Sequence, residues 1–224
     1  MYSIAIDGPS GSGKSSMAKR LARYLGFIYV DTGAIYRTTG LACLRAGIDC
    51  KDEEEVMSLL PELDIRIAYD SDGEQKMYLN GEDVSSQIRL PEVSIAASDV
   101  SAHGAVRAFL LEMQRRFARE NNVILDGRDI GTVVLPNADC KIYLTASAEV
   151  RAKRRMIELE AKGTPQPYED VLKDIEYRDY QDSHRESAPL KQADDAVLVD
   201  SSNLDIEQTF SKLLEVVNEK INCC

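Results

Sequence analysis

The sequence has 224 residues, of which 44% are hydrophobic, and its 38 acidic residues outnumber 27 basic ones to give a net charge of -11. This length and apolar content suit one α/β domain with inserted segments, and no apolar run approaches the roughly 18 residues that a membrane span needs. The acidic balance argues against a broad basic face for nucleic acid.

The first predicted element is a short β-strand over residues 2–7, which leaves no room for a signal peptide, so we expect a cytoplasmic location. A glycine-rich turn follows, and a helix is predicted over 15–25. Small residues at this spacing let successive N–H groups face the phosphates of a nucleotide, with Lys14 at the terminal phosphates and the Ser15 hydroxyl on magnesium. Switches, motors and kinases all use such a site, so the reaction stays open. The predicted phosphate-binding residues are Gly8, Pro9, Ser10, Gly11, Ser12, Gly13, Lys14, Ser15 and Ser16.

A second strand is predicted over 27–30, and it ends in Asp31-Thr32-Gly33 before a helix that carries Arg37. One interpretation is structural, because aspartate at this place is a good helix N-cap. The other is functional, because open parallel sheets bind ligands where their strands end.

The alternation of strands and helices then breaks over about residues 63–88. Residues 63–69 alternate apolar and polar side chains, 70–73 carry a turn signal, and the apolar pattern returns at 76–79. This pattern predicts a β-hairpin. The hairpin belongs either to an inserted subdomain or to an exposed flap.

A third cluster, Asp126-Gly127-Arg128-Asp129, directly follows another predicted strand. A glycine turn at a strand end is common, but two acids flanking a guanidinium have little purely structural use, so this cluster favours function.

Two arginine clusters lie on later predicted helices. One helix follows a strand predicted over 141–145 and carries Arg151, Lys153, Arg154 and Arg155; the other carries Arg178, Asp179, Asp182 and Arg185. Each helix face alone could be a solvated surface with pairs at i,i+3 and i,i+4. Arginines gathered near several strand ends of an acidic chain instead indicate a site for several phosphates.

The order of predicted elements is strand, helix, strand, helix, the hairpin break, then helix, strand, helix, strand, helix, helix, strand, helix, as in a parallel α/β sheet. The prolines at 165 and 167 indicate a hinge between the two late helices. The five cysteines form no C-x-x-C pair and only two histidines are present, so we expect neither a structural metal nor a disulfide framework.

Taken in order, these motifs resemble the bacterial cytidylate kinases. The matching segments are 8–15, 31–37, 126–132 and 178–185, the last followed by Ala188-Pro189-Leu190, and the resemblance covers nearly the whole chain. It implies a P-loop NTPase three-layer α/β fold with a parallel central sheet, an inserted NMP-binding subdomain with a small hairpin sheet, and a mobile helical lid. The expected bounds are 1–32 and 101–224 for the core, 33–100 for the insert and 151–167 for the lid.

The resemblance also implies transfer of the γ-phosphoryl group of ATP to CMP or dCMP, with Mg²⁺ as cofactor, in pyrimidine metabolism. The expected partners are free nucleotides, without nucleic acid or membrane, and we expect a monomer. The positions that match the family's substrate-binding residues are Thr32, Arg37, Ser98, Arg107, Arg128, Asp129, Arg178, Asp182 and Arg185. Those that match catalytic positions are Lys14, Arg128, Asp129 and the lid arginines Arg151, Arg154 and Arg155, and Ser15 and Asp126 are the expected metal residues.

Within the substrate set, Arg37, Arg107 and Arg128 match positions that hold the acceptor monophosphate, which suits the bidentate fork of arginine. Ser98 and Asp129, with Arg107, match positions that read cytosine. The sequence departs from the family pattern at Thr32, where serine is more usual, and at Tyr180 and Gln181, where charged residues are more usual.

Two rival functions remain at this stage. A kinase for another small acceptor, such as UMP or shikimate, would keep the phosphate loop but has no use for the 126–129 cluster together with the 178–185 face. A GTP-dependent switch would carry an Asn-Lys-x-Asp motif, which the sequence lacks.

Overall fold

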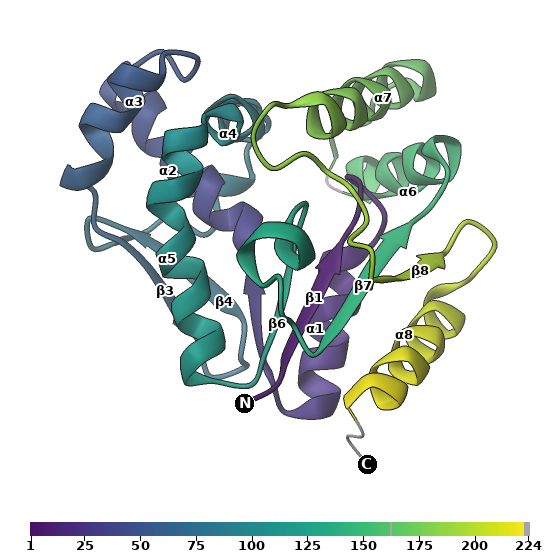
Figure 1. The fold of residues 1–224 in the computed structure, drawn as a ribbon. Helices are drawn as coiled ribbons and strands as arrows, with labels where there is room; N and C mark the ends of the chain where they lie inside the picture. The colour runs from purple at the N-terminus through teal and green to yellow at the C-terminus, as the bar shows by residue number, and fades with distance from the viewer. Residues whose placement is uncertain (162, 222–224) are drawn as a thin grey trace. The chain divides into compact units, whose positions relative to one another are not determined.

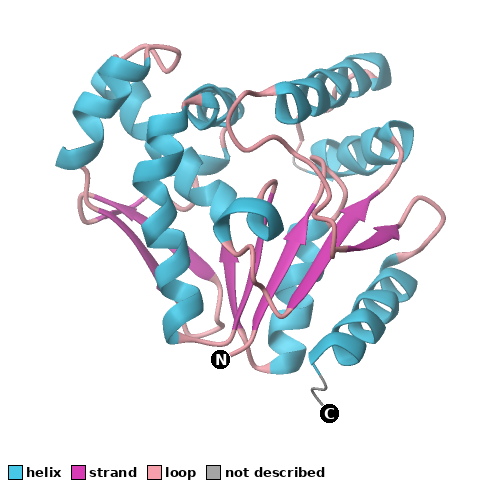
Figure 2. Ribbon diagram, viewed as in Figure 1, coloured by secondary structure: helices cyan, strands magenta, loops and turns pink. Residues whose placement is uncertain are grey.

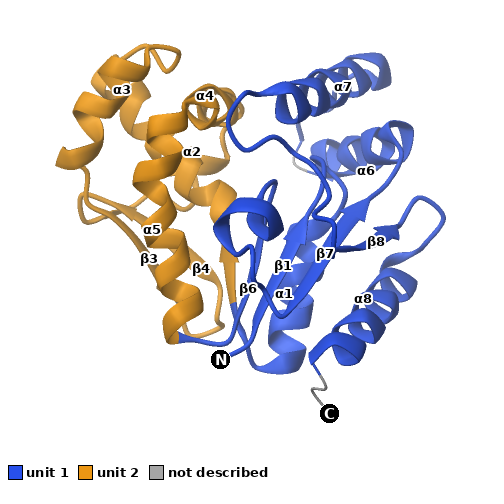
Figure 3. Ribbon diagram, viewed as in Figure 1, with its two compact units in different colours: residues 1–28, 121–224 blue, residues 29–120 orange. Residues whose placement is uncertain are grey.

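The computed structural model describes residues 1–161 and 163–221. The chain forms two compact units, of which unit 1 comprises residues 1–28 and the chain from residue 121 onward, and unit 2 comprises residues 29–120 (Figure 3). The expected bounds were 32/33 and 100/101, so the second unit is longer than the predicted insert. The difference arises because helix α5 (Gly104–Glu120) packs against α3 (Glu53–Leu59) and α4 (Pro91–Ala102).

The central sheet is parallel and has the strand order β2-β6-β1-β7-β8; Figure 1 labels β6, β1, β7 and β8. The chain passes from unit 1 to unit 2 within β2. Strand β1 is central, and its Ile6 lies opposite Asp126 of β6 and Ile142 of β7. The inner strands are apolar runs, as expected for a sheet covered on both faces. The strands are β1 (Ser3–Asp7), β2 (Ile28–Asp31), β6 (Val123–Gly127), β7 (Cys140–Thr145) and β8 (Val197–Asp200).

The helices of unit 1 are amphipathic and bury one face each. Helix α1 (Lys14–Leu25) buries Met17 and Leu21, one turn apart, and packs on β6 and on α8 (Ile206–Ile221). Helices α6 (Ala148–Ala161) and α7 (Tyr168–His184) pack on each other around a small apolar cluster that includes Ala152 and Val171. A five-residue π-helix, η3 (Ile130–Val134), stands between β6 and β7, where a regular helix was expected.

Unit 2 carries a second, antiparallel sheet in the order β3-β4-β5 (Figure 2). The hairpin of β3 (Ile65–Tyr69) and β4 (Gln75–Leu79) turns at Asp70, whose carboxylate accepts from the N–H groups of Asp72 and Glu74. Ile65, Met77 and Leu79 are buried in the core of unit 2. The hairpin therefore forms part of a folded unit and is not an exposed flap. The short strand β5 (Glu82–Asp83) was not foreseen.

The rest of unit 2 is helical, and its most extensive packing is between α2 (Thr32–Ala46) and α4. The two helices approach closely at Gly40, where a Cβ would lie 2.9 Å from the backbone nitrogen of Ala97. The remaining short segments are the 3-10 turns η1 (Leu60–Glu62) and η2 (Gln87–Arg89).

The predicted fold class, an α/β protein with a parallel central sheet and a small hairpin sheet, is confirmed. The predicted lid range, 151–167, includes residue 162, which lies outside the described residues. In the described part of the chain, no helix is both long and apolar enough to cross a membrane.

Candidate functional site

The phosphate loop begins where β1 ends and takes its shape from glycine. Gly8 has φ +148°, and a Cβ there would lie 2.0 Å from the carbonyl oxygen of Leu144 on β7. Gly11 and Gly13 also have positive φ, and Gly13 is the N-cap of α1. The loop therefore ends at a helix N-terminus, which favours bound anions through its free N–H groups and its dipole.

We expect Gly8→Ala to prevent this loop from forming. The collision with the Leu144 carbonyl should lower the free energy of unfolding by about 3 kcal/mol or more and abolish ATP binding. Gly26→Ala is the matched control, because Gly26 has φ +68° but no atom within 4 Å of the added Cβ, so it should lose only about 1 kcal/mol. Urea unfolding and ATP titration measure both effects, and equal losses in the two variants would contradict the steric argument.

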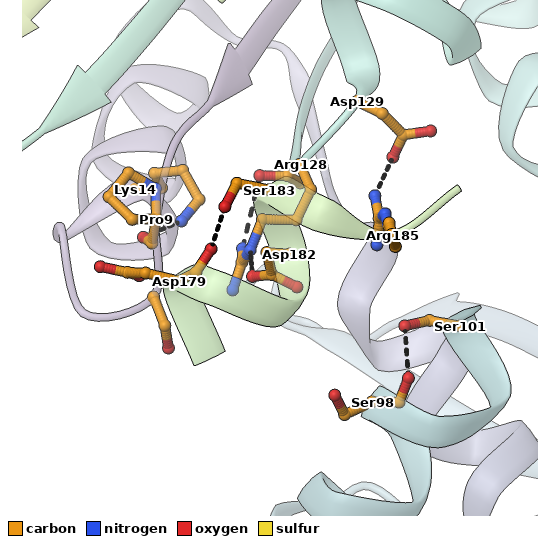
Figure 4. Close-up of polar contacts among 12 residues, drawn as sticks. Pro9, Lys14, Ser98, Ser101, Arg128, Asp129, Asp179, Asp182, Ser183 and Arg185 are labelled. Atoms are coloured by element: carbon orange, nitrogen blue, oxygen red, sulfur yellow. Dashed lines mark hydrogen bonds and ion pairs between the residues drawn. The ribbon is translucent and has the colours of Figure 1, made fainter. Parts of the chain in front are cut away.

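Lys14, the first residue of α1, is buried at 5% exposure, and its Nζ donates to the Pro9 carbonyl oxygen at 2.8 Å (Figure 4). Burial and the nearby positive charge of Arg128 lower the pKa of Lys14 to about 7. A cation in these surroundings gains most from an anion that enters the loop.

Ser15 and Asp126 meet where α1 begins and β6 ends. The Ser15 Oγ donates to a carboxylate oxygen of Asp126 at 2.8 Å, and Asp126 is buried at 4% exposure. A hydroxyl and a carboxylate suit Mg²⁺, which keeps several waters and nucleotide phosphates as further ligands. Among residues 1–161 and 163–221, no group of three or more His, Cys, Asp or Glu side chains could hold a metal by itself.

The loop after β6 places Arg128 and Asp129 against the C-terminal half of α7 (Figure 4). The Arg128 Nε donates to Asp182 at 2.6 Å, and the Asp129 carboxylate lies 3.6 Å from an Nη of Arg185. Arg185 also donates through Nε to the Ala188 carbonyl oxygen at 2.7 Å. These contacts bring together four of the residues that the sequence predicts to bind substrate.

The charges in this cluster shift the pKa values of its members. Burial alone would raise the pKa of Asp182, but the charge and hydrogen bond of Arg128 outweigh it, so the pKa is lowered. Burial would likewise lower the pKa of Arg128, but Asp182 raises it overall. Burial is the main reason why the pKa of Arg178 is lowered. The shifts of Asp182 and Arg128 both favour the charged forms, so the two side chains make a partly buried ion pair.

The arginines of α6 divide into two kinds. Arg151 is 4% exposed and donates to the Ala146 carbonyl, to the Ser10 carbonyl of the phosphate loop, and to both carboxylate oxygens of Asp179 on α7. Arg154 reaches the carbonyl oxygens of Ser12 at 3.4 Å and Ser201 at 2.8 Å. Arg155 instead pairs with Glu158 on the exposed side of the helix.

In unit 2, the predicted residues form a separate set. Asp31 caps α2 by accepting from the Ala34 N–H, and it also pairs with Arg37 at 2.7 Å. Burial opposes the shift, but Arg37 and the Ala34 N–H lower the pKa of Asp31. The structural interpretation of Asp31 is therefore correct, and the cap fixes Arg37 at the start of α2. Thr32, beside the cap, is buried.

The other two predicted residues of unit 2 lie on α4 and α5. Ser98 is exposed on α4, where its carbonyl oxygen accepts from the Ser101 hydroxyl (Figure 4). Arg107 is buried on α5, donates to the Ser101 carbonyl at 3.2 Å, and stacks over the Tyr36 ring at 5.2 Å. This Arg107 contact with α2 fixes the guanidinium on a packed surface.

Two further acids lie near these groups: Asp7 was missed in the sequence, and Asp179 was named in the α7 cluster without a role of its own. Asp7 ends β1 and accepts from the backbone of residues 130 and 131, and Asp179 holds Arg151. Asp7 does stand at a strand end, as the predicted site residues do. Its acceptor role was not visible, because its partners lie more than 120 residues away.

Comparisons with known proteins place the chain in a family. The sequence profile of the cytidylate kinases matches residues 4–219. The chain is 47% identical to a cytidylate kinase of Lactobacillus johnsonii, covering 98% of this chain and 95% of the relative, and 51% identical to one of Caldicellulosiruptor bescii, covering 95% and 94%. A solved shikimate kinase from Bacteroides thetaiotaomicron shares the fold, with a TM-score of 0.50 and 14% identity over 97% of this chain and 98% of that one. The chain therefore belongs to the cytidylate kinase family.

Proposed function

We propose that this protein transfers the γ-phosphoryl group of ATP to CMP or dCMP and so forms ADP and CDP or dCDP. The observation that carries the proposal is the family match over residues 4–219, with the phosphate loop and the 126–129 cluster both at strand ends of one parallel sheet. In the proposed division of labour, unit 1 binds ATP through residues 8–16.

The acceptor side chains fall into two groups by their chemistry. Arg37, Arg107 and Arg128 would hold the monophosphate, since a guanidinium matches phosphate oxygens bidentately. Ser98 and Asp129, with Arg107, would read the cytosine. The remaining proposed contacts, to phosphate, sugar and base side, come from Thr32, Arg178, Asp182 and Arg185.

Catalysis in this proposal rests on position and charge. The acceptor phosphate is already an anion, so no strong general base is needed, and the protein has to align the phosphates and offset charge on the transferring group. Lys14, Arg128 and the α6 arginines would supply that charge. Ser15 and Asp126 would hold Mg²⁺, which would supply Lewis-acid stabilisation of the charge on the phosphates of ATP.

Water competes with CMP for the phosphoryl group, so we propose that residues 151–167 act as a lid that excludes it. Arg151 and Arg154 contact the carbonyl oxygens of Ser10 and Ser12, which places both guanidinium groups at the phosphate loop. Arg155 is exposed and would turn inward only when the lid closes. We further propose that the protein is a monomer and works in the cytoplasm, where its nucleotide substrates are made and used.

The reaction itself is tested by following the label from [γ-³²P]ATP in the presence of CMP and Mg²⁺. Thin-layer chromatography should show the label in CDP, with none in CDP when Mg²⁺ is removed by a chelator. Label released only as inorganic phosphate would contradict the proposed phosphoryl transfer.

Asp129→Ala tests how cytosine is read. The exocyclic amine of cytosine donates a hydrogen bond that uracil lacks, so the loss of a buried acceptor should narrow the preference for CMP over UMP by about tenfold to a hundredfold. The ratio of the two kcat/KM values measures this preference, with the exposed hairpin-turn variant Asp72→Ala as control. An unchanged ratio in a folded Asp129→Ala protein would count against this role.

A further inference from the structure

We propose that Asp7 is a positioning residue that joins the phosphate loop to the segment carrying Arg128 and Asp129, and that it sets their backbone for acceptor binding. The inference rests on the proposed function for its kinetic consequences. Its structural part concerns unit 1 alone.

The geometry is that of a two-pronged carboxylate clamp. One Asp7 oxygen accepts from the Ile130 N–H at 2.7 Å, and the other accepts from the Gly131 N–H at 2.7 Å. The side chain is 4% exposed. A Cβ at Gly131 would lie 3.2 Å from the same carboxylate oxygen, so glycine gives Asp7 room to approach the backbone.

The π-helix η3 explains why this clamp is needed. The first N–H groups of a helix have no acceptor inside the helix. In η3 these are the N–H groups of residues 130 and 131, and the Asp7 carboxylate accepts a hydrogen bond from each. The N-cap residue Asp129 makes no side-chain cap hydrogen bond and has φ -142° and ψ 25°. The Asp7 side chain, which comes from β1, therefore caps η3 in place of Asp129. Its carboxylate also interacts favourably with the dipole at a helix N-terminus.

Asp7 and its hydrogen-bond partners adjoin the two proposed nucleotide-binding segments in the sequence. Asp7 is followed by Gly8, the first residue of the phosphate loop, and its partner Ile130 is preceded by Arg128 and Asp129. The two bonds hold the peptide groups that directly follow Arg128 and Asp129, whose side chains contact Asp182 and Arg185. Asp7 thus fixes the acceptor-binding pair relative to the donor loop within one unit.

Stability alone does not account for a carboxylate at this place. Burial raises the pKa of Asp7 to about 6, although the two N–H groups and the charge of Lys14 act in the opposite direction. Near neutral pH, the ionised form of Asp7 therefore lowers the stability of the folded protein. A neutral asparagine of the same shape is expected to fold.

Asp7→Asn keeps one acceptor and loses the other, so one of the two N–H groups is left unsatisfied. We expect hydrogen exchange at Ile130 or Gly131 to accelerate by about tenfold or more, with the melting temperature at pH 7 close to that of wild type, because removal of a buried charge offsets the unsatisfied N–H. The KM for CMP should rise by about tenfold or more, while the KM for ATP changes by less than about threefold.

Val134→Ala is the matched control, because Val134 is buried in the same π-helix but takes no part in the clamp. It should lower the melting temperature and leave the KM for CMP unchanged. The proposal is overturned if Asp7→Asn folds with both amides still protected and the KM for CMP unchanged, or if Val134→Ala raises that KM as much. A wild-type protein inactive on CMP would refute the proposed function, while hydrogen exchange would still decide whether Asp7 fixes the loop.

Discussion

Arg128→Ala is expected to lower the turnover of CMP by about a thousandfold, the scale seen when a guanidinium that offsets phosphoryl charge is lost. In the structure this guanidinium is partly buried and bonded to Asp182 at 2.6 Å. Under the proposed function, its removal takes one of three guanidinium groups from the acceptor phosphate, and it also removes the hydrogen-bonded partner of Asp182. A coupled assay of ADP release at saturating ATP and CMP measures the loss.

Two further variants test whether the loss of turnover in Arg128→Ala is specific to this guanidinium. Arg128→Lys keeps the charge but not the planar fork, so its turnover should lie between those of wild type and Arg128→Ala. Arg119→Ala removes an exposed arginine of α5 that pairs with Glu112 and should leave turnover unchanged. Near-normal activity of a folded Arg128→Ala protein would refute the assignment of Arg128 to the acceptor phosphate.

Lys14→Met should reduce turnover by about a hundredfold to a thousandfold, because under the proposed function it removes a buried, preorganised cation from the site of the donor phosphates. The same variant should be at least as stable as wild type at pH 7. Burial and Arg128 lower the pKa of Lys14 to about 7, so the charged form is held at a loss of stability that a neutral side chain of similar shape avoids.

The two effects of Lys14→Met are measured by the ADP-release assay and by thermal unfolding. Lys212→Met is the control, since Lys212 is exposed on α8 and pairs with Glu215. A Lys14→Met protein that melts well below wild type would mean that Lys14 serves the fold. A Lys14→Met protein that retains full activity would mean that Lys14 takes no part in phosphoryl transfer.

Much of the fold was predictable because its signals are local. The runs that became β1 and β6 are apolar since both faces of the sheet are covered, and each ends in a glycine turn. The hairpin was visible as alternation around Asp70 and Gly73. The tight turn after β1 was predictable, because its backbone can take that path only with glycine at Gly8.

The partners of the charged side chains were not predictable in the same way. Spacing on α7 indicated pairs within the helix, yet Asp179 bonds to Arg151 and Asp182 bonds to Arg128. These contacts join residues 28 and 54 positions apart. The sequence located the arginines but carried no local signal of which acid each would meet.

The same limit applies to Asp7 and to the second unit. Asp7 looked like the last residue of a strand, and its two acceptor bonds depend on the parallel pairing of β1 with β6. Helix α5 follows the predicted insert without a break in pattern, and only its packing on α3 and α4 assigns it to unit 2. Strand pairing decides the Asp7 contacts and helix packing decides the place of α5. These long-range contacts produce no periodic pattern in the sequence.

The central claim is that the acceptor is a cytidine monophosphate, and an acceptor panel tests it most directly. ADP release is measured with ATP and Mg²⁺ while CMP, dCMP, UMP, AMP, GMP and shikimate are offered separately at equal concentration, with Lys14→Met as the blank. We predict strong turnover with CMP and dCMP and little with the others. Equal turnover with UMP would contradict the base-reading role of Asp129, and no turnover with CMP or dCMP would contradict the proposed function.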